Sequence, residues 1–194
     1  LFDTQPLPWL LPKDDFDGLL IGSAAVFEHG GPQLAGLRAL PVHAVGEATA
    51  QAARAAGFEV NRAGAGGLQA LLDTSAEQPA RYLRLGGEER VPLAPGPGQS
   101  VTECAVYRVV PRPLHPVFTS SLAAGQTVVA LHSAAAARHF AAEVDRVGIA
   151  RGNLSLLALG PRVLEEAGLG WAAAHLAETP SDAALLANAT ALCK

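Results

Sequence analysis

The stretch Asp17-Gly-Leu-Leu-Ile-Gly-Ser23 decides the fold class, because a short apolar run ends in Gly-Ser and leads into an alanine-rich segment. This pattern is typical of a buried strand that feeds a helix. A second copy lies downstream, where Thr127-Val-Val-Ala-Leu-His-Ser133 leads into the helix-forming residues 134–147. The chain therefore contains at least two strand-to-helix units of the same kind.

The alternation of strand and helix continues around both copies. Residues 42–46 and 154–160 are expected strands, and the helices that follow them close on Gly57 and Gly168. The other expected elements are strands at 57–60, 82–87, 101–110 and 171–177, and helices at 47–56, 68–72, 161–167 and 181–192. Such regular alternation predicts an α/β protein with parallel, doubly wound sheets.

Matched landmarks predict two similar lobes. Ser23 and Ser133 lie 110 positions apart, and Gly46 and Gly160 lie 114 apart. Two landmarks at nearly one offset indicate a duplicated unit.

Three prolines between residues 111 and 116 mark the boundary between the lobes. We therefore expect a first α/β lobe over 9–107, a linker over 108–116 and a second lobe over 117–194. The second lobe has three expected strands, which make a thin sheet. We expect it to be completed by residues 1–8 and by N-terminal material missing from the sequence as given.

Composition excludes several classes of protein. Of the 194 residues, 49% are hydrophobic and 16% charged, which is typical of a globular chain rather than a disordered one. The net charge of −4 argues against a nucleic-acid surface. No apolar run is long enough to span a membrane and no signal-peptide pattern opens the chain, so we expect a cytoplasmic protein. Cys104 and Cys193 lie far apart and are expected to be plain thiols.

Motifs that bind cofactors are missing from the sequence. There is no GxGxxG after a strand, no P-loop, no GxSxG, no HExxH and no CxxC. The six histidines have no spacing that indicates a metal site. We therefore predict neither cofactor nor metal.

The expected functional site lies at the carboxyl ends of the strands, where open α/β sheets bind ligands. Ser23, Gly46, Ser133 and Gly160 all fall there. Backbone amides and small hydroxyl groups at these turns would suit an anionic ligand. The alternative is that Ser and Gly are simply common at such turns and helix caps.

Tyr107 stands in the last strand of the first lobe, just before the prolines. Its phenol is expected to face a cleft between the lobes. Equally, it could be a structural tyrosine that anchors the sheet.

The succession of motifs from about Leu7 onward resembles the uroporphyrinogen-III synthase (HemD) family. The segments that carry the resemblance are Asp17-Gly-Leu-Leu-Ile-Gly-Ser-Ala-Ala-Val26, Val42-His-Ala-Val-Gly-Glu-Ala-Thr-Ala50, Gly57-Phe-Glu-Val60, Val106-Tyr-Arg108, Val128-Val-Ala-Leu-His-Ser133 and Ala158-Leu-Gly-Pro161. The resemblance implies two HemD-like lobes joined by a two-stranded connector, with the active site in the cleft between them.

The resemblance also implies an activity. The reaction would be cyclisation of the linear tetrapyrrole hydroxymethylbilane to uroporphyrinogen III, with inversion of ring D and loss of water, without cofactor or metal. That substrate carries eight carboxylates. Tyr107 would be the catalytic residue, and the substrate-binding residues would be Ser23, Ala24, Gly46, Thr49, Ser133, Ala134, Gly160 and Arg162.

One position departs from the family pattern. Arg162 and Val163 stand where the family usually has a threonine shortly after Gly-Pro. Either a hydroxyl contact to a substrate carboxylate is lost, or Arg162 replaces it with a charge-assisted one. The competing interpretation of the whole chain is a non-enzymatic two-lobe module that binds a small anion as a sensor. In either case we expect a monomer.

Overall fold

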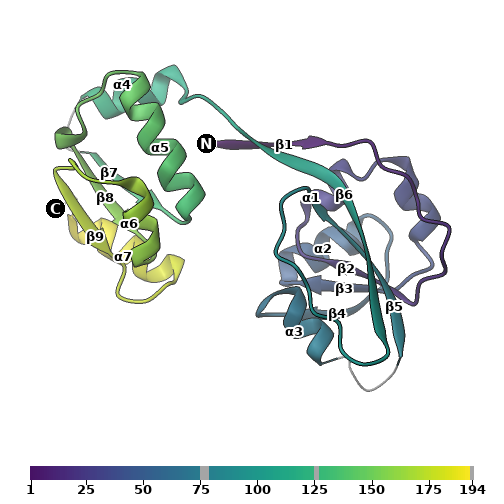
Figure 1. Cartoon of the computed structure of the whole chain (residues 1–194). Helices are drawn as coiled ribbons and strands as arrows, with labels where there is room; N and C mark the ends of the chain where they lie inside the picture. Colours follow the sequence, from purple (N-terminus) through teal and green to yellow (C-terminus); the bar gives the residue numbers. More distant parts are fainter. Residues whose placement is uncertain (75–78, 125–126, 193–194) are drawn as a thin grey trace. The chain divides into compact units, whose positions relative to one another are not determined.

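The computed structural model describes residues 1–74, 79–124 and 127–192, so Cys193 lies outside the described residues. Contacts divide the chain into two units (Figure 1). The first unit is Phe2–Val110, and the second unit is Pro111–Lys194 together with Leu1.

The first unit is built on a sheet of six strands. These are β1 (Phe2–Pro6), β2 (Gly18–Ile21), β3 (Val42–Val45), β4 (Val60–Gly64), β5 (Ala80–Gly87) and β6 (Gln99–Pro111), in the order β1-β6-β5-β2-β3-β4. The pairs among β2 to β6 are parallel. Hydrogen bonds from Leu7 N to Val106 O and from Arg112 N to Leu1 O bracket the β1–β6 pair. Residue numbers fall on one strand as they rise on the other, so this pair is antiparallel.

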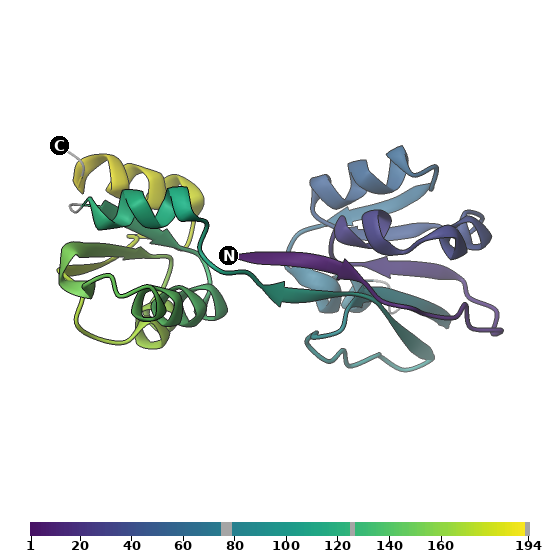
Figure 2. The ribbon, with the colours of Figure 1, turned by 90° about the horizontal axis from the view of Figure 1, so that it is seen from above.

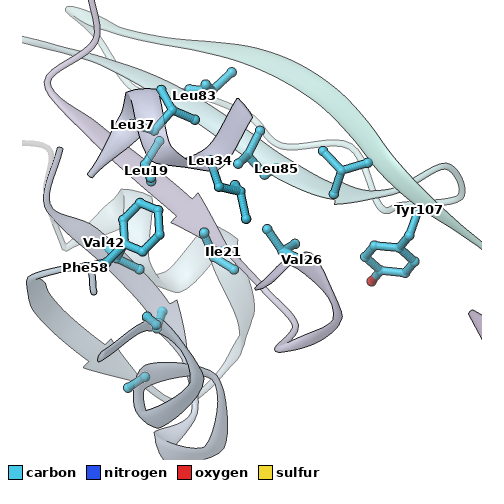
Figure 3. Close-up of a cluster of buried hydrophobic side chains, with 14 of the residues drawn as sticks. Leu19, Ile21, Val26, Leu34, Leu37, Val42, Phe58, Leu83, Leu85 and Tyr107 are labelled. Atoms are coloured by element: carbon cyan, nitrogen blue, oxygen red, sulfur yellow. The ribbon is translucent and has the colours of Figure 1, made fainter. Parts of the chain in front are cut away.

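Both faces of this sheet are covered. The helices are α1 (Ala25–His29), η1 (Pro32–Leu37), α2 (Glu47–Ala55) and α3 (Gly67–Asp73). Leu19 and Ile21 of β2 face a core shared with α1, η1 and α2, shown in Figure 3. Leu20 faces the other way and packs with Leu72 of α3. Because alternate strand residues point to opposite faces, a strand buried on both sides reads as a continuous apolar run.

The strand order places a switch point beside β2. From β2 the chain proceeds to β3 and β4 on one side, and β5 and β6 lie on the other side. The connections that leave the carboxyl ends of β2 and β5 therefore diverge. Ligands of open α/β sheets bind in the crevice at such a point.

His43 of β3 is buried and faces Tyr82 in an edge-on arrangement, with ring centroids 5.4 Å apart. Burial lowers the pKa of His43 below its usual 6.5, and the nearby Arg62 cation lowers it further. Its Nδ1 is fully buried without a hydrogen-bond partner among the described residues. The ring is therefore neutral at physiological pH.

The second unit contains a parallel sheet of three strands in the order β7-β8-β9. The strands are β7 (Thr127–Leu131), β8 (Leu154–Ala158) and β9 (Ala173–Leu176), and the helices are α4 (Pro116–Ala123), α5 (Ala134–Arg146), η2 (Arg151–Asn153), α6 (Pro161–Ala167) and α7 (Asp182–Leu192). Figure 2 shows α4 and α7 on one face of this sheet and α5 and α6 on the other. Phe140 of α5 is fully buried in the core of this unit.

A buried carboxylate holds the start of the second unit against α5. Glu143 accepts hydrogen bonds from Arg146 at 2.6 and 2.7 Å, and its Oε2 accepts from Leu114 N at 2.7 Å. These bonds, that of Arg146 first, lower the pKa of Glu143 from 4.5 to about 2.

The prediction of an α/β fold with parallel strands is confirmed, and the second unit has the three strands expected. The structure adds two details to the predicted domain division, which otherwise stays a prediction. Residues 1–8 were expected to complete the second lobe, but β1 pairs with β6 in the first unit, because its backbone supplies hydrogen bonds that the edge of β6 lacks. The predicted linker 108–116 also includes strand, since β6 continues through Pro111.

The predicted strand at 57–60 was misplaced, because β4 begins at Val60 and ends at Gly64. Across the part of the chain that is described, no helix is both long and apolar enough to cross a membrane.

Candidate active site

The turn after β2 presents Ser23 and Ala24 at the switch point of the first unit. Ser23 is half-buried, and its Oγ accepts a hydrogen bond from Ala25 N at 3.3 Å. A hydroxyl has one donor and two acceptor sites, so this contact leaves its proton available to a ligand. Ala24 is the N-cap residue of α1 and is also half-buried.

The turn after β3 contains Gly46, which precedes α2 with a φ of 76° that favours glycine. Its N–H donates to Gly64 O at 2.8 Å, so this amide is already paired, and a role of Gly46 and the amides near it in substrate binding stays a prediction. Thr49 lies one turn further, within α2, and only 5% of its surface is exposed. No hydrogen bond to the Thr49 hydroxyl is found among the described residues.

Tyr107 lies on β6 opposite Gly87, the last residue of β5, where the pairing register shifts. The residue is 9% exposed and belongs to the core that includes Val26 of α1. Figure 3 shows its ring at the margin of this core. A Cβ at Gly87 would lie only 3.1 Å from Tyr107 Cε2, so glycine is what allows the ring to lie against β5. Nothing in the described residues hydrogen-bonds the phenol oxygen.

His29 at the end of α1 is the neighbour of Tyr107 that the sequence did not reveal. The two ring centroids are 6.1 Å apart, and His29 Nε2 lies 2.6 Å from Thr4 Oγ1. Thr4 belongs to β1, so the antiparallel strand pair and α1 together fix the surroundings of Tyr107. A histidine pattern could not reveal this contact, because residues 4, 29 and 107 are brought together only by the β1–β6 pairing.

The second unit repeats the arrangement of the two turns. Ile21 is in register with Ala44 and Leu131 with Ala158, so each serine, Ser23 or Ser133, lies two residues beyond one strand. Each glycine, Gly46 or Gly160, follows the neighbouring strand within two residues.

Ser133 caps α5, with its Oγ accepting from Ala136 N at 3.1 Å. Ser133 is therefore a helix cap, as the alternative interpretation of such serines expects. Its hydroxyl proton can still be donated to a ligand. Ala134 lies in the first turn of α5. Gly160 precedes α6, where Pro161 has no N–H to offer.

Arg162 follows Pro161 and is exposed. Hydrogen bonding to Arg138, together with the charges of Arg138 and Arg162, holds the pKa of Glu166 below its usual value. Arg162 is therefore a cation at the carboxyl edge of the second sheet, next to the turn that Gly160 opens.

Within each unit the structure brings the predicted residues to one edge of a sheet. In the first unit these are Ser23, Ala24, Gly46 and Thr49, with Tyr107 on β6 opposite the carboxyl end of β5; in the second unit they are Ser133, Ala134, Gly160 and Arg162. Hydroxyl donors in both units and a guanidinium in the second suit an anionic ligand. No group of three or more His, Cys, Asp or Glu placed to hold a metal occurs in the described ranges. That both sets line one cleft stays a prediction.

Comparison with protein families adds the deciding observation. The family model for uroporphyrinogen-III synthase HemD matches residues 3–187, which is nearly the whole chain. The chain belongs to the uroporphyrinogen-III synthase family. The resemblance stated from the sequence motifs is thereby confirmed.

One solved structure of the family shares the fold of this chain. Uroporphyrinogen-III synthetase from Helicobacter pylori 26695 is 19% identical and superposes with a TM-score of 0.69, covering 99% of this chain and 91% of that one. A mutant uroporphyrinogen III synthase from the extremely thermophilic bacterium Thermus thermophilus is 18% identical with a TM-score of 0.48, covering 99% and 86% of the two chains. The search of curated proteins found no match.

Proposed function

We propose that this chain is a uroporphyrinogen-III synthase, which cyclises hydroxymethylbilane with inversion of ring D and loss of water. The observation that carries the proposal is the family match over residues 3–187, which includes the strand-end turns of both units. By reaction type the enzyme is a lyase that eliminates water.

Binding of the substrate rests on hydrogen-bond donors that face its carboxylates. The hydroxyls of Ser23 and Ser133 keep their protons available while their oxygens accept backbone N–H groups. Arg162 offers a forked guanidinium, which binds a carboxylate more strongly than the usual threonine hydroxyl would. The departure from the family pattern therefore strengthens a carboxylate contact.

Tyr107 is the group proposed to act on the reacting end of the substrate. Its phenol hydrogen-bonds the terminal hydroxyl oxygen, and as the C–O bond breaks the phenol proton passes to that oxygen, so the hydroxyl leaves as water. The phenolate is reprotonated by the proton that the substrate pyrrole loses on ring closure. Because phenols are weak acids at neutral pH, the hydrogen bond contributes more to the rate than the proton transfer does. A phenol opposite the carboxyl end of β5, without a hydrogen-bond partner among the described residues, supports this role.

Confinement is expected to contribute more than acid catalysis. The enzyme must impose one ring closure on a flexible chain that has an easier alternative, and holding reacting ends in place can lower a barrier by about 7–11 kcal/mol. The sequence offers no cofactor motif, so the proposal includes neither cofactor nor metal.

The test is to add hydroxymethylbilane to the purified protein and to separate the uroporphyrinogen isomers formed. Type III product above the uncatalysed background supports the proposal, and only the background isomer would refute it. No observation favours the non-enzymatic sensor module. A cytoplasmic monomer remains our prediction.

A further inference from the structure

A pocket of about 380 Å³ lies within the first unit. None of the proposed catalytic or substrate-binding residues lines it. It opens at the carboxyl ends of β2 and β3, next to Gly22 and Val45. Leu68 of α3 forms one wall, and residues 90–93 form another. The volume lies within the range of small-molecule sites.

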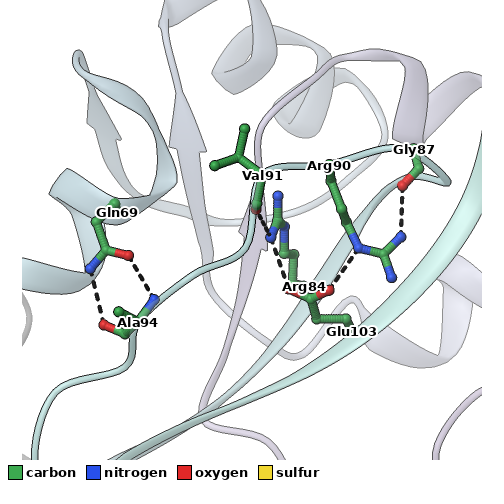
Figure 4. A network of polar contacts seen from close by, with 7 residues as sticks. All are labelled: Gln69, Arg84, Gly87, Arg90, Val91, Ala94 and Glu103. Carbon is green, nitrogen blue, oxygen red and sulfur yellow. Dashed lines mark hydrogen bonds and ion pairs between the residues drawn. The ribbon is translucent and has the colours of Figure 1, made fainter.

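The wall formed by residues 90–93 belongs to the segment 88–98, which joins β5 to β6 without a helix. Parallel strands are usually joined by a helical crossover, but residues 88–98 contain three prolines, which prevent one. Gln69 of α3 holds this segment through both ends of its amide, since Nε2 donates to Ala94 O at 3.0 Å and Oε1 accepts from Ala94 N at 2.9 Å (Figure 4). The wall is therefore fixed to the body of the unit.

Two arginines line the pocket, and they share one carboxylate. Arg84 of β5 is only 7% exposed, and its Nη1 lies 2.8 Å from Glu103 Oε1 and from Val91 O. Arg90 Nε donates to Glu103 Oε2 at 2.7 Å, and its Nη1 donates to Gly87 O. Figure 4 shows both guanidinium groups converging on Glu103.

The cluster carries one excess positive charge. Burial alone would raise the pKa of Glu103, but hydrogen bonds from Arg90 and Arg84 outweigh that effect and lower it. Glu103 is therefore ionised, and it balances one guanidinium of the two. Among the described residues that line the pocket, the charged ones are Arg84 and Arg90.

Part of each guanidinium is still free to bind. A guanidinium has five N–H donors, and no partner for the Nη2 of Arg84 or Arg90 is present in the described part of the chain. His43 Nδ1 is the sole fully buried and unpartnered side-chain nitrogen or oxygen found there. The unpartnered nitrogens of Arg84 are therefore not fully buried, and the open space that this residue lines is the pocket.

We propose that this pocket binds a carboxylate on a short aliphatic arm. The free guanidinium edges take the carboxylate, and the apolar walls at Val45, Leu68 and Leu93 contact the methylene groups of the arm. Within the proposed function, on which this identification of the occupant rests, the arm is an acetate or propionate side chain of the tetrapyrrole.

The experiment measures binding without turnover. The full chain, labelled with ¹⁵N, is titrated with propionate and with a monopyrrole that bears one carboxymethyl and one carboxyethyl arm. We expect shifts of the amide signals of Gly22, Val45 and Leu68, and tighter binding of the pyrrole than of propionate. Inorganic phosphate serves as the competing anion.

Two variants and one control make the test specific. Arg90→Gln removes the excess positive charge. It should lower the affinity for the pyrrole by on the order of tenfold, which corresponds to the loss of one charge-assisted hydrogen bond. Val91→Asp places a negative charge at the pocket and should lower the affinity for the pyrrole by a similar factor. Because the Val91 side chain is 78% exposed and the backbone carbonyl stays in place, folding should be unaffected. Arg81→Gln changes an exposed arginine of the same strand outside the pocket and should change nothing.

Unchanged affinity in both variants, or amide shifts confined to other parts of the chain, would overturn the proposal. Phosphate binding at least as tight as the pyrrole would overturn the assignment to a carboxylate arm. Because binding is read without turnover, pyrrole binding in a protein that lacks synthase activity would refute the proposed function and the tetrapyrrole assignment while confirming the carboxylate pocket.

Discussion

Replacing Tyr107 by phenylalanine separates a chemical role from a structural one. The phenol has no hydrogen bond to lose among the described residues, and the ring would keep its place against Gly87. The free energy of unfolding should therefore fall by less than the roughly 1 kcal/mol of a typical hydrogen bond. For a chain of this size, that limits the drop in melting temperature to about 4 °C.

The effect on catalysis should be much larger. A group that assists proton transfer typically contributes on the order of 10²-fold or more to rate, which corresponds to about 2.7 kcal/mol of activation free energy. The assay measures initial rates of uroporphyrinogen III formation and thermal unfolding of the same samples. Tyr82→Phe is the matched control, because the chain has two tyrosines and Tyr82 lies in the other core, against His43.

Each alternative has its own result. Normal turnover with a clear loss of melting temperature would show that Tyr107 is structural. Normal turnover with normal melting would remove it from the mechanism, and catalysis would then rest on backbone amides and confinement. An equal loss of turnover in Tyr82→Phe would show that the assay reports a general disturbance of the first unit.

Three further predictions follow from the packing and the pKa shifts. Gly87→Ala places a Cβ 3.1 Å from the Tyr107 ring and should lower turnover. Gly86→Ala, with nothing within 4 Å of its Cβ, should leave turnover normal. Equal turnover in the two variants would show that the position of the ring does not matter. Glu143, with its pKa lowered from 4.5 to about 2, should contribute stability that is lost as the pH falls through that range, and Glu143→Gln should flatten the unfolding profile there. His43, with its pKa lowered, should cost stability as the pH falls below 6.5, because only the unfolded state then takes up the proton; ¹H NMR titration showing an ordinary pKa would refute this.

Much of the fold could be predicted because the central strands β2 and β8 are buried along almost their whole length. Short apolar runs such as 18–21 and 154–158 favour buried strands in a globular chain, and the helices after them begin at recognisable turns. β1 was missed for a physical reason. Its side chains are mostly exposed, and it is held by backbone hydrogen bonds, which leave no trace in the sequence.

The misplaced β4 illustrates the opposite error. Phe58 supplied the apolar signal and is indeed buried, but it precedes the strand, while the strand itself lies at the edge of the sheet with mostly exposed residues. A hydrophobic pattern indicates which side chains are buried, not which residues pair with the next strand. The prediction therefore placed the strand at the buried Phe58 instead of at the residues that pair with β3.

The turns of the candidate site, with Ser23 and Ser133, could be proposed from the sequence because strand ends are visible there, and so could the cation Arg162. The cluster around Arg84 could not. Arg84 was overlooked although it interrupts an apolar strand, which is a signal in itself, because a buried cation needs a partner. That partner, Glu103, is 19 residues away and adjacent only through the pairing of β5 with β6.

The most direct test of the account is the isomer composition formed from hydroxymethylbilane by the purified chain. We predict uroporphyrinogen III as the main product, at a rate well above the uncatalysed cyclisation and unaffected by metal chelators. Product of the uncatalysed composition, or activity that requires an added metal, would contradict it.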